Sequence, residues 1–314
     1  MSRLKRVILW LLVALVACSL MACSAVGGPR GGAIKLTDDA GRTVELAKTP
    51  ERIISLAPSN TEILFALSLG NKVVGITDFC DYPPEAAAVE KVGGIEPNPE
   101  KIVALKPDLI LAIGGSPVTA SIAGNVELLN KFDELKLNVL ILSPTDLESV
   151  LADIKLVGRA TGTEKAAEQL VAEMQKKVDD VVAKTKNVSQ RPKVFYELDA
   201  TDPAKPFTPG PGSWHDKFIT MAGGVNIAAN APAQWAQLSA EEIVAQNPDI
   251  IILGDANWGM DAAAVKARPG WGAIKAVQEG DIYPIDDNLL SRPGPRVADG
   301  LVALAKIIHP ELFQ

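Results

Sequence analysis

One sequence pattern occurs twice in the chain, and it limits the possible folds more than any other feature. Residues 97–112 read PNPEKIVALKPDLILA, and residues 238–253 read LSAEEIVAQNPDIIIL. When the two copies are aligned, both contain Ile-Val-Ala and Pro-Asp at matching places, and Glu100 meets Glu241. Each copy predicts a short helix followed by a buried apolar strand. The repetition therefore predicts two related α/β lobes.

The sequence around each copy alternates between apolar strands and helices. In the first half, apolar runs at residues 53–56, 73–76, 109–113 and 138–142 predict buried strands. Residues 34–46 precede them and predict an antiparallel hairpin. The alternation resumes after the middle of the chain and ends in a C-terminal helix. Buried strands that alternate with helices favour mostly parallel sheets covered on both faces.

The helix that follows the first apolar strand has predicted ends. Ser59 or Asn60 is expected to cap its N-terminus, and Gly70 is expected to end it. In the second half, Ser213 and Gly224 bracket a helix at the same spacing as Ser59 and Gly70. This weaker correspondence supports the interpretation of two related lobes.

A long helical segment separates the two lobes. Residues 147–189 are rich in Ala, Glu, Lys and Val, and apolar residues recur among them at helical spacing. Gly158 and Gly162 mark candidate bends within the segment. The folded part of the chain therefore divides into an N-terminal lobe at residues 34–146, this helical linker, and a C-terminal lobe at residues 190–314.

Residues 1–22 have the organisation of a secretory signal. Basic residues precede an apolar run that is shorter than the roughly 20 residues of a membrane-spanning helix. Residues 20–23 read LMAC and resemble a bacterial lipobox, which predicts lipid attachment at Cys23, with Cys18 as the alternative. Residues 23–33 then form a flexible tether. We expect an extracytoplasmic protein, periplasmic or on the cell surface, that its lipid holds at the membrane; an uncleaved N-terminal anchor would leave it on the same side.

The composition argues against nucleic-acid binding and against an internal disulfide. The formal net charge is −7, and loss of residues 1–22 removes basic residues only, so the mature chain is more acidic still. An acidic surface repels a phosphate backbone. Cys80 is the only cysteine after Cys23, so the mature chain cannot form an internal disulfide.

A catalytic or cofactor site has little support in the sequence. Ser213 and His215 lie close together in GPGSWH, but the glycine that a nucleophile elbow needs after its serine is missing. His215 and His309 are the only histidines, which are too few for a multi-histidine metal centre. We therefore expect no enzyme, no metal and no cofactor, and we expect Ser213 to cap a helix. An extracytoplasmic hydrolase with His215 as its base is the contrasting alternative.

The two aligned glutamates have no evident role in capping their helices. In the second copy, Ser239 and Glu242 form a predicted capping box, which leaves Glu241 uninvolved. In the first copy, Asn98 is the predicted cap and Glu100 follows it inside the first turn. We expect Glu100 and Glu241 to face outward as a matched pair, one on each lobe.

Several segments, in a fixed order, resemble the periplasmic cobalamin (vitamin B12) binding proteins of ABC importers. The segments are RIISLAPSNTEILFALSLGNKVVGITDFCDYPP, EKIVALKPDLILA, FTPGPGS, AGGVNIA and SRPGPRVADGL, and the resemblance extends from about Ile34 to the end of the chain. It implies two α/β lobes with mostly parallel sheets, joined by a single long α-helix, and a ligand cleft between the lobes. The same helical-backbone class also includes haem and ferric-siderophore binding proteins.

The resemblance implies roles for individual residues. Glu100 and Glu241 stand where members of the family form salt bridges with arginines of a permease dimer, which works with ATPase subunits. Cobalamin is then the transported ligand rather than a cofactor, and the binding protein is expected to be a monomer. Loop position and resemblance together give these expected ligand-binding residues: Phe79, Tyr82, Phe207, Trp235, Asn288 and Arg292.

The chain departs from the cobalamin binders in its first lobe. Gly93-Gly94 and Ile113-Gly114-Gly115 stand where the best-known member presents tryptophans. Because the first lobe offers fewer aromatic walls, a haem or ferric-siderophore binder is the alternative, with Tyr82 as a candidate haem ligand. Arg296 is assigned either to the ligand or to the start of the last helix. The leading hypothesis is a lipid-anchored binding protein that delivers cobalamin or a related corrinoid to an ABC permease.

Overall fold

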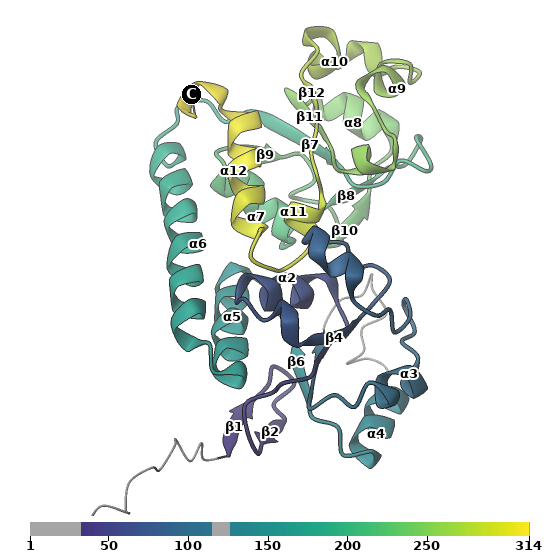
Figure 1. Ribbon diagram of the computed structural model, residues 1–314. Coiled ribbons are helices and arrows are strands. Elements are labelled where there is room, and N and C mark those ends of the chain that lie inside the picture. Colours follow the sequence, from purple (N-terminus) through teal and green to yellow (C-terminus); the bar gives the residue numbers. More distant parts are fainter. Residues whose placement is uncertain (1–32, 115–125, 314) are drawn as a thin grey trace, which may run out of the picture.

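The computed structural model describes residues 33–114 and 126–313. Together these residues form two α/β lobes (Figure 1). The sheets have the strand orders β4-β3-β5-β6 and β12-β11-β7-β9, and their neighbouring strands are parallel. The two-lobed α/β prediction is therefore confirmed. The strands of these sheets are β3 (Ile53–Ser55), β4 (Val73–Ile76), β5 (Leu109–Ile113), β6 (Val139–Leu142), β7 (Lys193–Glu197), β9 (Val225–Asn226), β11 (Ile250–Leu253) and β12 (Ile282–Pro284).

Two antiparallel ribbons accompany the parallel sheets. One pairs β1 (Ile34–Thr37) with β2 (Thr43–Leu46), as the hairpin prediction required, and the other pairs β8 (Phe207–Pro209) with β10 (Trp235–Gln237). The turn of the first ribbon is held by the Asp38 carboxylate, which accepts hydrogen bonds from the backbone N–H groups of Ala40 and Arg42. Gly41 completes this turn with a φ of 74°, where glycine is favoured.

Helices cover the sheets and connect the lobes. Three predicted caps are confirmed: Asn98 caps α3, Ser213 caps α7, and Ser239 forms a capping box with Glu242 at α8. The described α-helices are α2 (Pro58–Ala66), α3 (Pro99–Ala104), α4 (Val126–Glu134), α5 (Leu147–Thr161), α6 (Glu164–Thr185), α7 (Trp214–Met221), α8 (Ala240–Gln246), α9 (Ala262–Lys266), α10 (Lys275–Glu279), α11 (Asn288–Ser291) and α12 (Val297–Ile308).

The predicted ends of α2 are wrong. The helix begins at Pro58, whose fixed φ suits the first helical position, so Ser59 and Asn60 are buried inside the first turn instead of capping it. At the other end, Ser68 adopts the left-handed conformation, with a φ of 61°, that Gly70 was expected to supply. Gly70 instead begins a short 3-10 helix.

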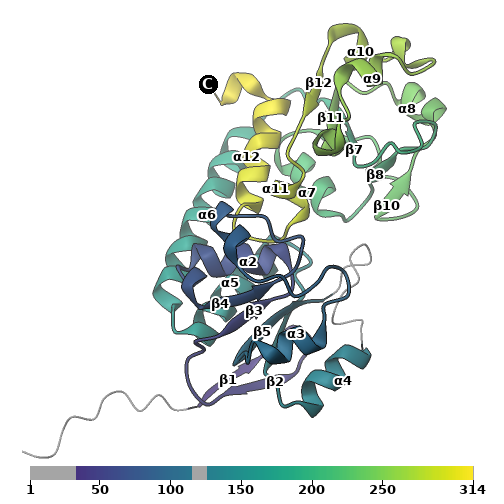
Figure 2. The same ribbon diagram turned by 45° about the vertical axis from the view of Figure 1, so that its right-hand side comes forward.

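The helical connection between the lobes bends at Gly162, one of the two predicted candidate bends, so that α5 is followed by the long helix α6. Gly162 has a φ of 71° and ends α5, and α6 begins two residues later. The two helices pack closely because residue 158 is glycine: a Cβ there would lie 2.6 Å from the Cβ of Ala167. α5 packs on α2 and β1 of the N-terminal lobe, whereas α6 continues to α7 and α12 of the C-terminal lobe (Figures 1 and 2).

Each face of the N-terminal sheet has its own apolar layer. On β5, Leu109 and Leu111 point to the side of α2 and α5, whereas Ile110 and Ala112 point to the side of α3 and α4. This alternation follows the two-residue period of a strand. The sheet is therefore buried on both faces, as its continuous apolar runs predicted.

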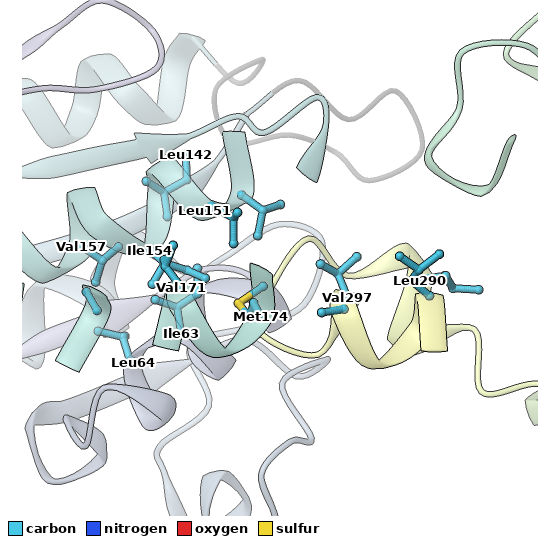
Figure 3. Close-up of a cluster of buried hydrophobic side chains, with 14 of the residues drawn as sticks. Ile63, Leu64, Leu142, Leu151, Ile154, Val157, Val171, Met174, Leu290 and Val297 are labelled. Carbon is cyan, nitrogen blue, oxygen red and sulfur yellow. The ribbon is translucent and has the colours of Figure 1, made fainter. Parts of the chain in front are cut away.

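One apolar cluster continues from the N-terminal lobe into the C-terminal lobe (Figure 3). Ile63 of α2 and Ile154 of α5 belong to it, and Met174 of α6 carries it toward Val297 at the start of α12. All four side chains are almost fully buried. The lobes therefore share part of their core instead of meeting through solvent-exposed surfaces.

The predicted N-terminal features lie outside the described residues. They are the signal at residues 1–22, the tether at residues 23–33, apart from residue 33, and the lipidation candidates Cys18 and Cys23. Within residues 33–114 and 126–313, no helix combines the length and the apolar character needed to cross a membrane.

A buried carboxyl group lies beneath the β1–β2 hairpin. Asp153 of α5 is almost completely buried, and its Oδ2 atom has no hydrogen-bond partner among the described residues. Burial raises the pKa of Asp153 from an ordinary 3.8 to about 9, and the neighbouring Asp39 adds to this effect. Asp153 is therefore a neutral acid in the folded protein near neutral pH.

We expect Asp153→Asn to flatten the pH dependence of stability. Between about pH 4 and pH 9 the folded protein keeps a proton on Asp153 that the unfolded chain has lost. The free energy of unfolding of the wild type therefore falls as pH rises, by up to about 1.4 kcal/mol per pH unit from this group. Urea unfolding at several pH values measures the slope.

An exposed carboxylate provides the control for this experiment. Asp133→Asn on α4 changes the same atoms without a buried site, so it should keep the wild-type slope. A slope for Asp153→Asn equal to that of the wild type would show that Asp153 ionises normally in the folded state.

Candidate functional site

Loops from both lobes meet where the parallel strands end. Residues 77–83 follow the carboxyl end of β4, and residues 285–296 follow the carboxyl end of β12. An ion pair between Arg292 and Asp81 joins these two segments across the lobes. Carboxyl ends of parallel strands are the usual place for a ligand site in open α/β sheets.

Glu62 is the centre of the contact between the lobes. Its side chain lies in α2 and is only 2% exposed. Arg296 from the C-terminal lobe binds it with two hydrogen bonds, Nε to Oε2 at 2.9 Å and Nη2 to Oε1 at 2.6 Å. Arg292 adds a longer contact of 3.5 Å from Nη1 to Oε1. We call Glu62, Asp81, Arg292 and Arg296 the interlobe clamp.

The outer arm of the clamp is the pair of Arg292 and Asp81. Arg292 donates from Nη1 to Asp81 Oδ1 at 2.6 Å and from Nη2 to Asp81 Oδ2 at 3.3 Å. The hydrogen bond from Arg292 holds the pKa of Asp81 below its ordinary value, although partial burial opposes this. In the same way, the Glu62 carboxylate raises the pKa of Arg296.

Tyr82 packs against the clamp. The Arg296 guanidinium carbon lies 3.9 Å from the centroid of the Tyr82 ring, which is a cation–π contact. The ring is still 41% exposed, and it borders a recess of about 620 Å³ that Phe65 and Pro295 also line. Arg296 therefore both precedes α12, as one of its two assignments required, and supports a predicted ligand residue.

Phe79 lies beside Gly94, one of the glycines that distinguish the first lobe. A Cβ placed on Gly94 would be 3.7 Å from the Phe79 ring, and the ring is 51% exposed. The preceding glycine, Gly93, has a φ of 118°, which a residue with a side chain rarely adopts. An aromatic surface is thus present on this part of the lobe, but it comes from residue 79.

Phe207 and Trp235 lie on the β8–β10 ribbon. Trp235 is directly opposite Pro209, and Phe207 precedes Pro209 by two residues, so Phe207 and Trp235 share one face of the ribbon. Phe207 is 43% exposed, whereas Trp235 contacts His215 edge to face with ring centroids 5.8 Å apart. The structure therefore brings these two predicted aromatic residues to the same surface.

A buried polar network fixes the segment that carries Asn288 and Arg292. The Tyr196 hydroxyl donates to Asp287 Oδ1 at 2.6 Å, and His215 Nε2 lies 3.0 Å from the same oxygen. Burial opposes ionisation of Asp287, but hydrogen bonds from His215, Ser291 and Tyr196 hold its pKa below its ordinary value. Asp287 directly precedes α11, so the network anchors this short helix.

The serine and histidine of GPGSWH have separate partners. The Ser213 hydroxyl donates to the carbonyl oxygen of Gly210 at 2.8 Å and accepts from the backbone N–H of Asp216. His215 is directed to Asp287. Ser213 therefore acts as the helix cap predicted from the sequence, and its observed partners do not include the base that the hydrolase alternative requires.

Glu100 and Glu241 each lie in the first turn of a short surface helix, α3 and α8. Figures 1 and 2 place these helices on different lobes, on the side of the molecule away from α6. Glu100 pairs with Lys131 at 3.2 Å, and its own backbone N–H together with Lys131 lowers its pKa. Both carboxylates are exposed, and neither caps its helix.

Sequence reasoning missed the clamp and the anchoring network. None of the three carboxylates Glu62, Asp81 and Asp287 was among the predicted site residues. The available signal for Glu62 was weak: a charged residue directly before Ile63 in a helix packed on a buried strand. The partner of Glu62 is 234 residues away in the sequence, so no local pattern indicates the pair.

The chain is similar to several known proteins along most of its length. A model of the periplasmic binding protein family matches residues 53–289. A Bacillus subtilis protein described as an uncharacterized ABC transporter substrate-binding lipoprotein is 33% identical over 320 residues, which cover 99% of both chains.

Two solved structures share the fold. The periplasmic vitamin B12 binding protein of Vibrio cholerae has a TM-score of 0.68 and 27% identity, over 84% of this chain and 99% of that one. The periplasmic haem-binding protein of Roseiflexus has a TM-score of 0.71 and 27% identity, over 83% of this chain and 99% of that one. These matches span both lobes and the helices between them, and the predicted resemblance is confirmed.

We expect Glu62→Gln to lower the free energy of unfolding by about 3 kcal/mol, because it leaves two arginines partly buried without their shared carboxylate. The measurement is urea unfolding at pH 7. Glu90→Gln, an exposed change of the same kind in the N-terminal lobe, should have almost no effect. A loss below about 1 kcal/mol for Glu62→Gln would mean that the clamp contributes no more than a surface ion pair.

Proposed function

Because the chain belongs to the periplasmic binding protein family, we propose that it captures cobalamin or a related corrinoid outside the cytoplasm and delivers it to an ABC permease. The observation that carries this proposal is a set of four aromatic side chains contributed by both lobes, three of them exposed and the fourth, Trp235, partly buried. They come from Phe79 and Tyr82 in one lobe and from Phe207 and Trp235 in the other.

The chemistry of these residues suits a corrinoid. A corrin ring has broad apolar faces and a rim of amide side chains. Aromatic rings can cover the faces, and a few polar groups can bind the rim. Asn288 and Arg292 supply such groups from α11 and its end, which the buried network around Asp287 holds in place.

A haem or ferric-siderophore complex is the second candidate within the same class. The observation in its favour is the exposed ring of Tyr82, because a tyrosine oxygen can bind haem iron. The likeness to the haem-binding protein of Roseiflexus is consistent with either ligand. Catalysis is not part of the proposal, because Ser213 and His215 are engaged in capping and anchoring.

The proposal includes the location and the partners of the protein. Lipid attachment at Cys23, with Cys18 as the alternative, would keep the protein at the membrane in the periplasm or at the cell surface. The partner would be a permease dimer with its ATPase subunits, and the binding protein would act as a monomer. The relative from Bacillus subtilis, described as a substrate-binding lipoprotein of an ABC transporter, supports this arrangement.

Titration calorimetry of the purified mature protein tests the ligand. We expect binding of cyanocobalamin at micromolar protein and weak or no binding of haemin and of a ferric siderophore. We also expect Trp235→Ala to weaken cyanocobalamin binding about tenfold or more, which is about 1.4 kcal/mol, because the indole ring supplies stacking area.

Tyr283→Ala is the matched control for the loss of an aromatic ring. Tyr283 lies on β12 and its hydroxyl donates to Asp281, which directly precedes that strand at the end away from Asn288 and Arg292. Removal of the Tyr283 ring should therefore leave the affinity for cyanocobalamin unchanged. Absence of heat with cyanocobalamin would refute the corrinoid proposal, and binding of haemin or siderophore instead would select the second candidate.

We expect Glu100→Arg combined with Glu241→Arg to leave ligand affinity unchanged and to stop uptake in cells. Both residues lie on the outer surface, where a reversed charge repels arginines of a permease. The measurements are calorimetry for affinity and accumulation of labelled ligand for transport.

Two other exposed glutamates control for the change in net charge. Glu148→Arg with Glu168→Arg alters α5 and α6, on the opposite side of the molecule, and should leave uptake normal. Loss of ligand affinity in the Glu100 and Glu241 variant would contradict a docking role.

A further inference from the structure

The two arms of the interlobe clamp differ in their exposure to solvent. The Glu62 side chain is 2% exposed and has two hydrogen bonds from Arg296, whereas the Asp81 side chain is 66% exposed. An exposed ion pair is weakened by water and salt, and a buried pair is not easily separated because each charge would lose its partner. The pair of Glu62 and Arg296 is therefore fixed, and the pair of Asp81 and Arg292 is exchangeable.

The exchangeable arm lies among the proposed ligand-binding groups. Asp81 is two residues from Phe79 and next to Tyr82, in the loop of residues 77–83. Arg292 follows α11, the helix that begins with Asn288. A ligand that touches these neighbours would also reach the Arg292 guanidinium, which has donor groups suited to carbonyl and carboxylate oxygens.

Arg292 can change one partner without becoming unpaired. Its Nη1 atom lies 2.6 Å from Asp81 and 3.5 Å from Glu62, so Glu62 continues to balance its charge when Asp81 leaves. Asp81 itself is exposed enough to be solvated by water after the pair opens. Neither group is left as an isolated buried charge, which is the usual obstacle to breaking an ion pair.

We propose that Asp81 pairs with Arg292 in the unliganded protein and that an oxygen acceptor of the ligand replaces Asp81 when the ligand binds. Competition from Asp81 thereby limits the affinity of the protein for its ligand. This inference rests on the proposed function. The acceptor is an amide oxygen if the ligand is a corrinoid and a carboxylate oxygen if it is haem. Asp81 is thus a positioning residue, acting through Arg292.

The first experiment measures binding to Asp81→Asn by titration calorimetry with cyanocobalamin and with haemin. Loss of the competing carboxylate should tighten binding of the ligand that the wild type accepts by about three- to tenfold. Asp133→Asn, an equal change of charge on an exposed side chain of α4, should leave the affinity at the wild-type value. Wild-type affinity in Asp81→Asn would overturn the proposal.

A coupled variant separates this role from a general effect of charge. In an Arg292→Gln background, Asp81 has no guanidinium to occupy, so the further change Asp81→Asn should leave the affinity as it is in Arg292→Gln alone. The same gain in affinity with and without Arg292 would show that Asp81 acts on the ligand directly, which contradicts the proposal.

The second experiment does not need a ligand, so it distinguishes failure of this inference from failure of the proposed function. Phenylglyoxal modifies accessible arginines, and mass spectrometry measures the rate at Arg292. We expect Asp81→Asn to raise this rate severalfold and Asp133→Asn to leave it unchanged. Arg268, buried in a pair with Glu197, is the internal control for protein unfolding. An unchanged rate at Arg292 in Asp81→Asn would overturn the proposal even if cyanocobalamin binds.

Discussion

The shared apolar core between α5, α6 and α12 determines how the two lobes can be arranged. Met174 of α6 and Val297 of α12 are buried in one apolar cluster that contains residues of both lobes. Exposure of one side chain of this kind costs roughly 1.5–3 kcal/mol, so wide separation of the lobes would cost many such contacts. The connection is therefore buried like the interior of a single domain, and we expect motion between the lobes to be limited to a small hinge.

The interlobe clamp restricts the relative position of the lobes further, because its hydrogen bonds are directional. Apolar contact is not directional, and a shared core alone would allow the lobes to slide over a small range. The two hydrogen bonds between Arg296 and Glu62 have fixed geometry and define one position of α12 against α2. The core opposes separation and the Glu62–Arg296 pair opposes sliding, so the start of α12 is held at a reproducible position against α2.

Local patterns were sufficient to predict the strands of the N-terminal lobe, several helix caps and the two-lobed plan, because these features depend on neighbouring residues, whereas the β8–β10 ribbon was not predicted. Gly158 and Gly162 were both candidate bends, and the sequence did not distinguish them, because the role of Gly158 depends on how closely α5 packs against α6. For the site, resemblance gave the residues, and the structure showed that Phe207 and Trp235 share a face. The clamp could not be predicted, because Glu62 and Arg296 come together only when both lobes have folded.

The position of Phe79 beside Gly94 has a consequence for selectivity. A tryptophan on the glycine segment itself would form a wall of fixed depth, whereas a phenylalanine on a loop that is joined to the other lobe through an exposed ion pair can shift with that loop. If the ligand is a macrocycle, as proposed above, such a surface would accommodate flat ligands of different thickness. Discrimination between related ligands would then depend on the polar groups at the edge of the cleft, and changes at the axial faces of a macrocycle would be accepted more readily than changes at its periphery.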